Sequence, residues 1–315
     1  MPLKKYILLL LSCGLCWTAC VEQRTSPVKH TDTLTSGKIK ISVDESFRPV
    51  MEEQLKVFLA SNPDAQIEAS YKTEAECLKD VLLGTETRMA IVTRGLSAKE
   101  EKFFKDSLGY SPSWNELATD ALVVVLHPSN PDTLFTKEKL RNLLSGRSGS
   151  DVQVVFDGKQ ATSAVRYALD SLLQGQPFDT SVVRAVGNSQ GVLDFVAENP
   201  KAIGLVGISW IGNPQDPAQV AMLKRVKMGW VACDYCEDKA YVKPTQIGIV
   251  AKRYPLVRGL YFILKENHQG LGAGFVNFMQ YERGQLIFRR SYLGSSRMGF
   301  AIRSVKINEK IPESR

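Results

Sequence analysis

Hydroxyl side chains occur where the sequence changes from a strand pattern to a helix pattern, and they are the first candidates for binding chemistry. From Ile39 to Val43 apolar residues alternate with polar ones, which predicts a strand, and from Phe47 to Leu59 apolar residues recur at helical spacing. Ser46 lies at the junction and can cap the helix. A hydroxyl beside free backbone N–H groups at a helix start suits a small anion. A plain helix cap is the simpler interpretation, and this stretch alone favours it.

A second candidate is the sequence GNSQG at 187–191, a G-x-S-x-G pattern between a predicted strand and a predicted helix. That context is the one a nucleophile elbow requires, with Ser189 as nucleophile. Either Asp234 or Asp238, together with His268, could complete a serine hydrolase triad. However, no glycine-rich oxyanion segment precedes the pattern, and a pattern with three fixed positions recurs by chance. We therefore favour Ser189 as a helix cap.

The third candidate is the C-x-x-C pair Cys233 and Cys236. One such pair in a chain with three histidines does not make a zinc site, so no metal is expected. A local disulfide is the favoured interpretation for an exported protein, and it leaves Cys77 as a buried thiol. No P-loop and no dinucleotide fingerprint are present, so no cofactor is expected, and nothing requires an enzyme.

The N-terminus has the pattern of an export signal. Lys4 and Lys5 precede an apolar run at 6–17 that is too short to span a bilayer as a helix, and small residues lead to Cys20. A small residue before cysteine resembles a bacterial lipobox, which predicts a lipid on Cys20. Cleavage without lipid and use of Cys13 are the alternatives. Residues 21–37 are rich in Ser, Thr and single charges, which predicts a tether.

Composition and charge limit the classes of protein that the chain can belong to. Its 315 residues, 44% hydrophobic, are enough for two globular domains, and it carries no later membrane span. Its net charge is +7, and without Lys4 and Lys5 it would be 7 − 2 = +5. The basic residues are scattered among acidic ones, which indicates a solvated surface and not a nucleic-acid interface. Nothing indicates oligomerisation, and we expect a monomer.

The elements that position these residues alternate along the chain, which predicts α/β lobes with parallel strands. Capping boxes at Thr73/Glu76 and Ser97/Glu100 open two of the helices. Residues 117–127 form the longest apolar strand, which should be buried on both faces. We expect strands at 39–43, 66–71, 89–92, 117–127, 152–156, 182–186, 202–207, 246–250, 260–264 and 298–307, and further helices at 136–145, 162–173, 189–199, 275–281 and 285–292.

Several segments, in order, resemble the phosphate-binding subunits of bacterial ABC uptake systems, the PstS-like family of type II periplasmic binding proteins. They are ISVDESFRPVMEEQLKVF, ATDALVVVLHPSNP, LFTKEKLRNLLSG, GVLDFVAENPKAIGLVG, YPLVRGLY and GFVNFMQYERGQLIF, between about Ile39 and Gly299. The resemblance implies two α/β lobes, each a mixed sheet flanked by helices. Two crossover strands, around Leu117 to Leu126 and around Val231 to Ile247, would join the lobes and act as hinges. The expected divisions are a signal peptide at 1–20, a linker at 21–37, lobe 1 at 38–117, lobe 2 at 118–232 and a return to lobe 1 at 233–315.

The resemblance also implies a small oxyanion held between the lobes by strand-to-helix junctions. Carried over by position, the ligand-binding residues are Ser46, Phe47, Thr73, Thr93, Arg94, Thr162, Ser163 and Arg166, with Ala161 beginning the junction of the second lobe.

Two departures from the family pattern affect the ligand. The family's cleft aspartate corresponds to Ala90, and its cleft arginine to Asp157 or Gly158. Arg94 or Arg166 could supply the missing positive charge, and an ordinary salt bridge is an equally good interpretation of each. Phosphate is therefore the default ligand.

These features predict a non-enzymatic, lipid-anchored solute-binding protein of the bacterial cell envelope that delivers its oxyanion to an ABC permease. It would face the periplasm or lie on the cell surface. The alternatives are an anion sensor or interaction module that no longer transports, and a serine hydrolase that uses Ser189.

Overall fold

The computed structural model describes residues 31–149, 151–158, 162–237 and 240–296. The chain divides into Met1–Thr31 and Asp32–Arg315, and every element named below lies in the second unit. The predicted signal peptide with Cys20, most of the linker, Ala161, Asp238 and the last strand at 298–307 lie outside the described residues. Within the described ranges, no helix has the length and apolar character needed to cross a membrane.

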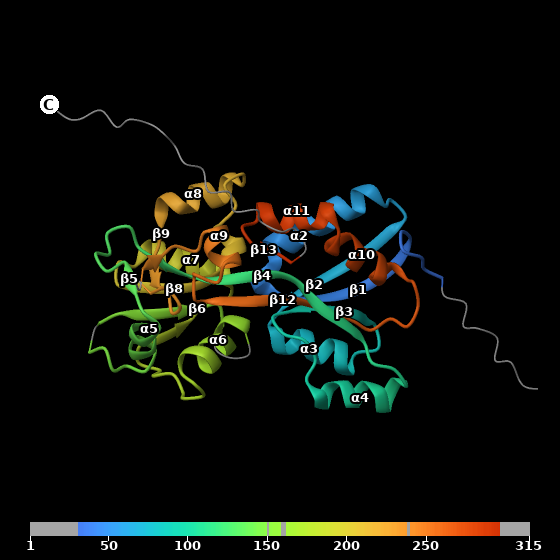
Figure 1. The fold of residues 1–315 in the computed structure, drawn as a ribbon, viewed down its shortest axis with the longest axis horizontal. Helices are drawn as coiled ribbons and strands as arrows, with labels where there is room; N and C mark the ends of the chain where they lie inside the picture. Colours follow the sequence, from blue (N-terminus) through green and yellow to red (C-terminus); the bar gives the residue numbers. More distant parts are fainter. Residues whose placement is uncertain (1–30, 150, 159–161, 238–239, 297–315) are drawn as a thin grey trace, which may run out of the picture. The chain divides into compact units, whose positions relative to one another are not determined.

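Among the residues that the structure describes, the first lobe contains five strands and five helices. The strands are β1 (Gly37–Asp44), β2 (Ala65–Lys72), β3 (Thr87–Val92), β12 (Val257–Leu264) and the short β13 (Gly294–Ser295). The helices are α2 (Arg48–Ser61), α3 (Glu74–Leu83), α4 (Ala98–Leu108), α10 (Leu271–Gln280) and α11 (Glu282–Arg290). In Figure 1, α2, α10 and α11 lie on one face of the strands, and α3 and α4 lie on the other. Both faces of this sheet are therefore covered by helices.

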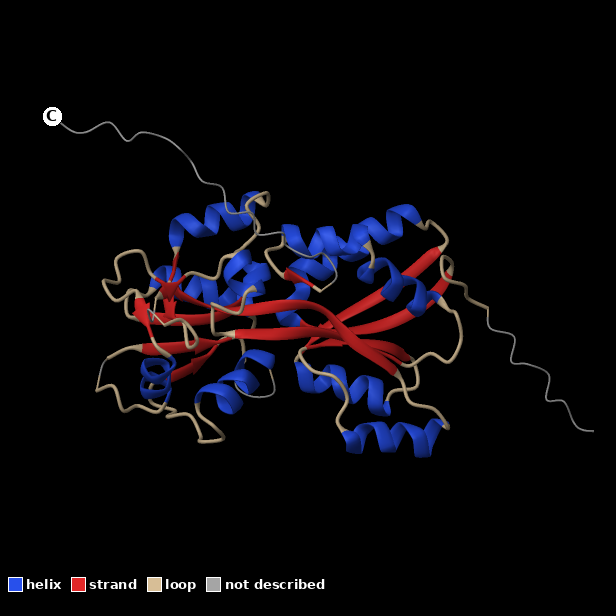
Figure 2. Ribbon diagram, viewed as in Figure 1, coloured by secondary structure: helices blue, strands red, loops and turns tan. Residues whose placement is uncertain are grey.

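The second lobe has shorter elements. Its strands are β5 (Leu134–Phe135), β6 (Gln153–Phe156), β7 (Val183–Ala185), β8 (Ala202–Gly207), β9 (Lys227–Met228), β10 (Trp230–Ala232) and β11 (Tyr241–Val242). Its helices are α5 (Lys137–Leu144), α6 (Ser163–Tyr167) with a following π-helical turn (Ala168–Leu172), α7 (Ser189–Glu198), α8 (Pro217–Arg225) and α9 (Gln246–Val250). Figure 2 shows the strands as a layer between helices.

One long strand, β4 (Ser113–Leu126), connects the two lobes. The hydrogen-bonded strand order is β2-β1-β3-β12-β4-β8-β6-β7, with β13 and β9 also on β4. β1 is parallel to β2 and β3, whereas β12 is antiparallel to β3 and β4. The first part of β4 pairs with β12 and the last part, Leu122–Leu126, pairs with β8. The chain therefore has the two-lobe type II binding-protein architecture that the sequence predicts, with β4 as the first crossover.

The second crossover is not where the sequence predicts it. Within the range Val231 to Ile247, β10 and β11 pair with each other and with β5, in a small sheet of the second lobe. The segment Gln246–Val250 is a helix instead of the predicted strand, because Thr245 caps it by accepting from the Gly248 N–H. The chain returns to the first lobe through β12, which lies beside β4 along its length (Figure 1).

The folded part also begins earlier than the predicted end of the linker at residue 37. Asp32 is buried, and its carboxylate pairs with Arg88 and accepts from the Leu271 N–H at 2.9 Å. Burial alone would raise the pKa of Asp32, but the hydrogen bonds from Leu271 and Arg88 outweigh it and lower that pKa to about 2.

Candidate functional site

The strand ends of both lobes meet at one buried contact. In open α/β sheets, ligands bind beyond the carboxyl ends of parallel strands, and here β1 leads to Ser46 and β6 leads towards Ser163. The two hydroxyl oxygens lie 3.0 Å apart, and both side chains are buried. The backbone carbonyl of Ser46 also accepts from Ser209 at 3.1 Å and from the indole of Trp210 at 3.0 Å, both in the second lobe. The first junction is thus held by several parts of the other lobe.

Arg258 of β12 supplies the positive charge at this contact. Its Nε donates to Asp120 of β4 at 2.7 Å and its Nη1 donates to Ser163 at 2.8 Å. Its guanidinium lies 5.3 Å from the centre of the Phe47 ring. The side chain is only 4% exposed, and its Nη2 has no hydrogen-bond partner. A buried guanidinium with one unused donor group is suited to donate to an oxygen atom of a ligand.

Three buried aspartates surround this arginine. Asp44, Asp120 and Asp157 each have one carboxylate oxygen without a hydrogen-bond partner. Burial raises the pKa of Asp44 to about 7, although the charge of Arg258 opposes that shift. Burial likewise raises the pKa of Asp157. The site is therefore rich in acceptors as well as donors.

The raised pKa of Asp44 predicts a pH effect on stability. Because the folded state binds this proton more tightly than the unfolded state, the aspartate destabilises the fold as pH rises from about 4 to about 7. Asp44→Asn should therefore gain stability relative to the parent by up to about 1.4 kcal/mol per pH unit in that window. Urea unfolding at pH 4.5, 6 and 8 measures it. The exposed Asp64→Asn is the control, and parallel pH profiles for Asp44→Asn and the parent would contradict the prediction.

A second contact joins α3 to α6 across the lobes. Glu74 begins α3 and forms an ion pair with Arg166 of α6, with 2.5 Å between Nε and Oε2. The backbone N–H of Thr93 donates to Glu74 at 2.8 Å, and the Thr93 hydroxyl contacts both Glu74 and Arg166. Burial alone would raise the pKa of Glu74, but these hydrogen bonds outweigh it and the pKa lies below its usual value. Two of the carried-over residues, Thr93 and Arg166, thus meet at one carboxylate.

The other carried-over residues have local partners. Thr162 caps α6 by accepting from the Val165 N–H, and it is buried beside Ser163. Thr73 is occupied by its capping box with Glu76, as predicted for that helix.

Arg94 makes a two-pronged ion pair with Glu100, both hydrogen bonds being 2.8 Å long. The contacts of Arg94 therefore agree with the salt-bridge interpretation.

Two predicted helix caps are wrong. Ser46 lies inside a short 3-10 helix (Glu45–Phe47) whose cap is Asp44, and its hydroxyl faces the other lobe instead. Ser189 begins α7, but the cap is Asn188, whose side chain accepts from the Gly191 N–H at 2.8 Å. In both cases a residue one or two positions earlier, Asp44 or Asn188, has a side-chain oxygen that accepts from a free backbone N–H of the helix start.

The structure does not assemble the hydrolase triad from the described candidates. The Ser189 hydroxyl donates to Glu45 at 2.8 Å, whereas His268 contacts Asp32 at 3.1 Å and Asp234 pairs with Lys137. The serine therefore contacts a carboxylate and not the histidine that would act as its base.

Cys233 and Cys236 are joined in a disulfide, with Cα atoms 5.5 Å apart, and Cys77 is a buried free thiol. The bridge closes the turn after β10.

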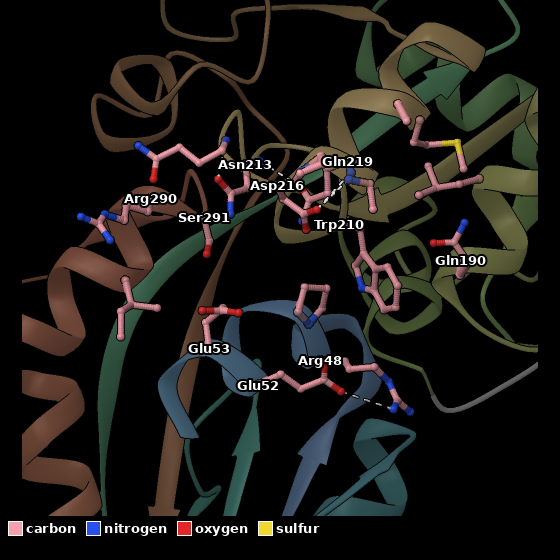
Figure 3. A pocket seen from close by; sticks show the side chains of 18 of the residues that line it. Arg48, Glu52, Glu53, Gln190, Trp210, Asn213, Asp216, Gln219, Arg290 and Ser291 are labelled. Atoms are coloured by element: carbon pink, nitrogen blue, oxygen red, sulfur yellow. Dashed lines mark hydrogen bonds and ion pairs between the residues drawn. The ribbon is translucent and has the colours of Figure 1, made fainter. Parts of the chain in front are cut away.

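A groove of about 870 Å³ opens between α2 and α11 on one side and α7 and α8 on the other. Figure 3 shows Arg48, Glu52 and Glu53 on α2, with Asn213, Asp216 and Gln219 opposite them. Trp210 lines the groove and donates to the carbonyl of Ser46, so one wall of the groove reaches the buried contact.

Two α/β lobes that meet through their strand-to-helix junctions define the fold of type II periplasmic binding proteins. A family model described as the PBP superfamily domain matches residues 28–283, and the chain belongs to that family. No curated protein matches the chain.

Solved structures of similar fold include several phosphate-binding proteins. A phosphate ABC transporter substrate-binding protein from Clostridium perfringens, with bound phosphate, is 20% identical, with a TM-score of 0.67 over 83% of this chain and 100% of that chain. An ABC-type phosphate transport receptor from Vibrio cholerae is 20% identical, with a TM-score of 0.59 over 82% and 100%. The OxyR2 regulatory domain from Vibrio vulnificus, 10% identical, reaches a TM-score of 0.50 over 78% and 96%. At these identities the likeness establishes the fold and not the ligand.

Two charged residues of the site, Arg258 and Glu74, are not among the residues that the sequence predicts for it. Arg258 stands within YPLVRGLY, one of the segments that carries the family resemblance, but nothing local distinguishes it from a surface arginine. Glu74 follows the capping residue Thr73 and has the pattern of an ordinary first-turn acid. Only the packing of the two lobes shows that both are buried at the contact.

Proposed function

We propose that the chain is an exported, lipid-anchored solute-binding protein that takes a small oxyanion between its lobes and presents it to an ABC permease. Phosphate is the first candidate. The observation that carries the proposal is the meeting of Ser46 and Ser163, from different lobes, beside the unused Nη2 of Arg258. Hydroxyls at helix starts with one buried guanidinium give a dehydrated oxyanion several hydrogen bonds. The fold similarity to phosphate-binding proteins supports the same ligand class.

The surrounding aspartates influence which form of the anion fits. A fully ionised oxyanion would face the unpartnered oxygens of Asp44 and Asp157, whereas a ligand that carries its own O–H group could donate to them. The export signal and Cys20 support the envelope location and the lipid anchor. Recovery of Cys20→Ser in the membrane fraction, at the level of the parent, would contradict the anchor.

The experiment that tests the ligand is thermal unfolding of the chain from Val21 onward with phosphate, sulfate, molybdate, a phosphonate and citrate. A ligand at about a hundred times its dissociation constant adds about 2.7 kcal/mol to the free energy of unfolding. We expect phosphate to raise the unfolding midpoint and Ser163→Ala to remove most of that shift. Ser107→Ala, on the exposed side of α4, is the matched control and should keep it. If no anion shifts the midpoint, the oxyanion function is wrong.

A second function is favoured by a specific observation. The lobes already contact each other directly through Ser46 and Ser163, and through Glu74 and Arg166. A cleft filled by its own side chains is the feature expected of an interaction module or sensor that does not transport. A thermal shift that is absent for all five anions would favour this alternative.

A further inference from the structure

The donors that would bind an oxyanion at the second contact already hold a carboxylate of the chain itself. Glu74 accepts from the Thr93 N–H at 2.8 Å, from the Thr93 hydroxyl, and from two nitrogens of Arg166 at 2.5 and 3.2 Å. Its side chain is only 2% exposed. Protein hydrogen-bond donors therefore replace the water that would otherwise surround this buried carboxylate.

These donors are of the kinds that recognise a free oxyanion. A backbone N–H after a strand, a neighbouring hydroxyl and a forked guanidinium together match the oxygens of a carboxylate, a phosphate or a sulfate. Thr93 and Arg166 are also among the residues that the sequence predicts for the ligand. The Glu74 carboxylate therefore lies where an oxygen group of the solute would lie.

A second glutamate, next to Ser46 in the chain, repeats the arrangement. Glu45 accepts from the Ser189 hydroxyl at 2.8 Å and from the Ser189 N–H at 3.3 Å. Ser189 is the first residue of α7, so this carboxylate lies at the positive end of a ten-residue helix. Glu45 and Glu74 both belong to the first lobe, whereas Ser189 and Arg166 both belong to the second.

We propose that Glu74, supported by Glu45, is an internal anion that holds the two lobes together when no solute is bound. A solute that uses Thr93 and Arg166 must displace Glu74 first. The competition between Glu74 and a solute oxyanion rests on the proposed function. The closure of the lobes by Glu74 does not depend on phosphate being the ligand. In a protein without such an internal anion, the lobes would close only when an external anion supplied the negative charge.

The test measures the distance between the lobes with spin labels, in the chain from Val21 onward. One label replaces Lys102 on α4 and the other replaces Lys224 on α8, both exposed. The parent should give one narrow distance distribution that inorganic phosphate leaves unchanged. Glu74→Gln should shift and broaden the distribution, because the neutral amide cannot replace the ion pair with Arg166. Glu138→Gln, an exposed glutamate on α5, is the control and should match the parent.

A second measurement follows anion binding by calorimetry with inorganic phosphate and acetate. Removing the internal competitor should lower the dissociation constant of at least one of these anions tenfold or more in Glu74→Gln. If Glu74→Gln fails to fold, Arg166→Gln is used in the distance measurement instead. The Arg166 side chain is 37% exposed and carries the other half of the ion pair. Whichever variant folds must open the lobes for the proposal to stand.

The outcomes separate this inference from the proposed function. If Glu74→Gln opens the lobes but neither anion binds any variant, the internal anion is supported and the oxyanion function fails. If phosphate binds the parent and Glu74→Gln equally and the distance does not change, the oxyanion function stands and the internal anion is overturned.

Discussion

Arg258→Met is expected to lower the free energy of unfolding by about 3–5 kcal/mol, because it leaves buried carboxylates without their cation. Asp120 is fully buried and loses its 2.7 Å ion pair, while Ser163 loses the donor at 2.8 Å. Methionine has a similar length and is apolar, so most of the loss reflects charge and not volume. Urea unfolding at pH 7.5 measures the effect.

Two variants accompany this measurement. Arg253→Met, at an exposed position five residues earlier, should change stability by no more than about 0.5 kcal/mol. Adding Asp120→Leu to Arg258→Met should recover much of the loss, since replacing both partners of a buried ion pair by apolar residues is often neutral. A loss below about 1 kcal/mol in the single variant would mean that Arg258 is not the counter-ion of this site.

Phe47→Ala is expected to cost about 3–5 kcal/mol, the range for truncating a buried aromatic side chain. Phe47 is fully buried at the junction between β1 and α2, and its ring lies under the guanidinium of Arg258. The cavity would remove packing contacts from the core and the support that orients Arg258. Chemical denaturation of the variant and the parent gives the difference.

Phe103→Ala is the matched control, because Phe103 is 43% exposed on α4 and should lose much less stability. A cost for Phe47→Ala no larger than that of Phe103→Ala would show that the first junction is not part of the tightly packed core. Phe47→Leu should fall between the two, since it keeps most of the apolar volume.

Local features of the fold could be predicted because their causes are local. The capping boxes at Thr73 and Ser97 form as the sequence indicates, since each needs only residues three positions apart. The long apolar strand at 117–127 is β4, and its nearly continuous apolar run fits its burial on both faces.

Predictions failed where a short apolar segment had to be assigned without its surroundings. Residues 246–250 read QIGIV, which fits a buried strand or one turn of a helix equally well. Thr245 caps a helical turn at this position. Ile247 is exposed in that turn, so the apolar pattern of the segment did not indicate which side chains are buried. The second crossover was misplaced for the same reason, because the pairing of β12 with β4 is a long-range property.

The sequence by itself determined most of the alternation of strands and helices, the family resemblance and the hydroxyl groups at the junctions. These follow from spacings of a few residues and from recognisable segments. The tertiary structure alone decided which charges meet: Arg166 with Glu74, 92 residues apart, and Arg258 with Asp120, 138 residues apart. An arginine or glutamate at a helix start has the same local pattern whether it faces water or the other lobe. Its partner is fixed by the packing of the chain, because burial makes an unpaired charge costly and so requires a counter-charge nearby, from the facing lobe for Arg166 and from the neighbouring strand for Arg258.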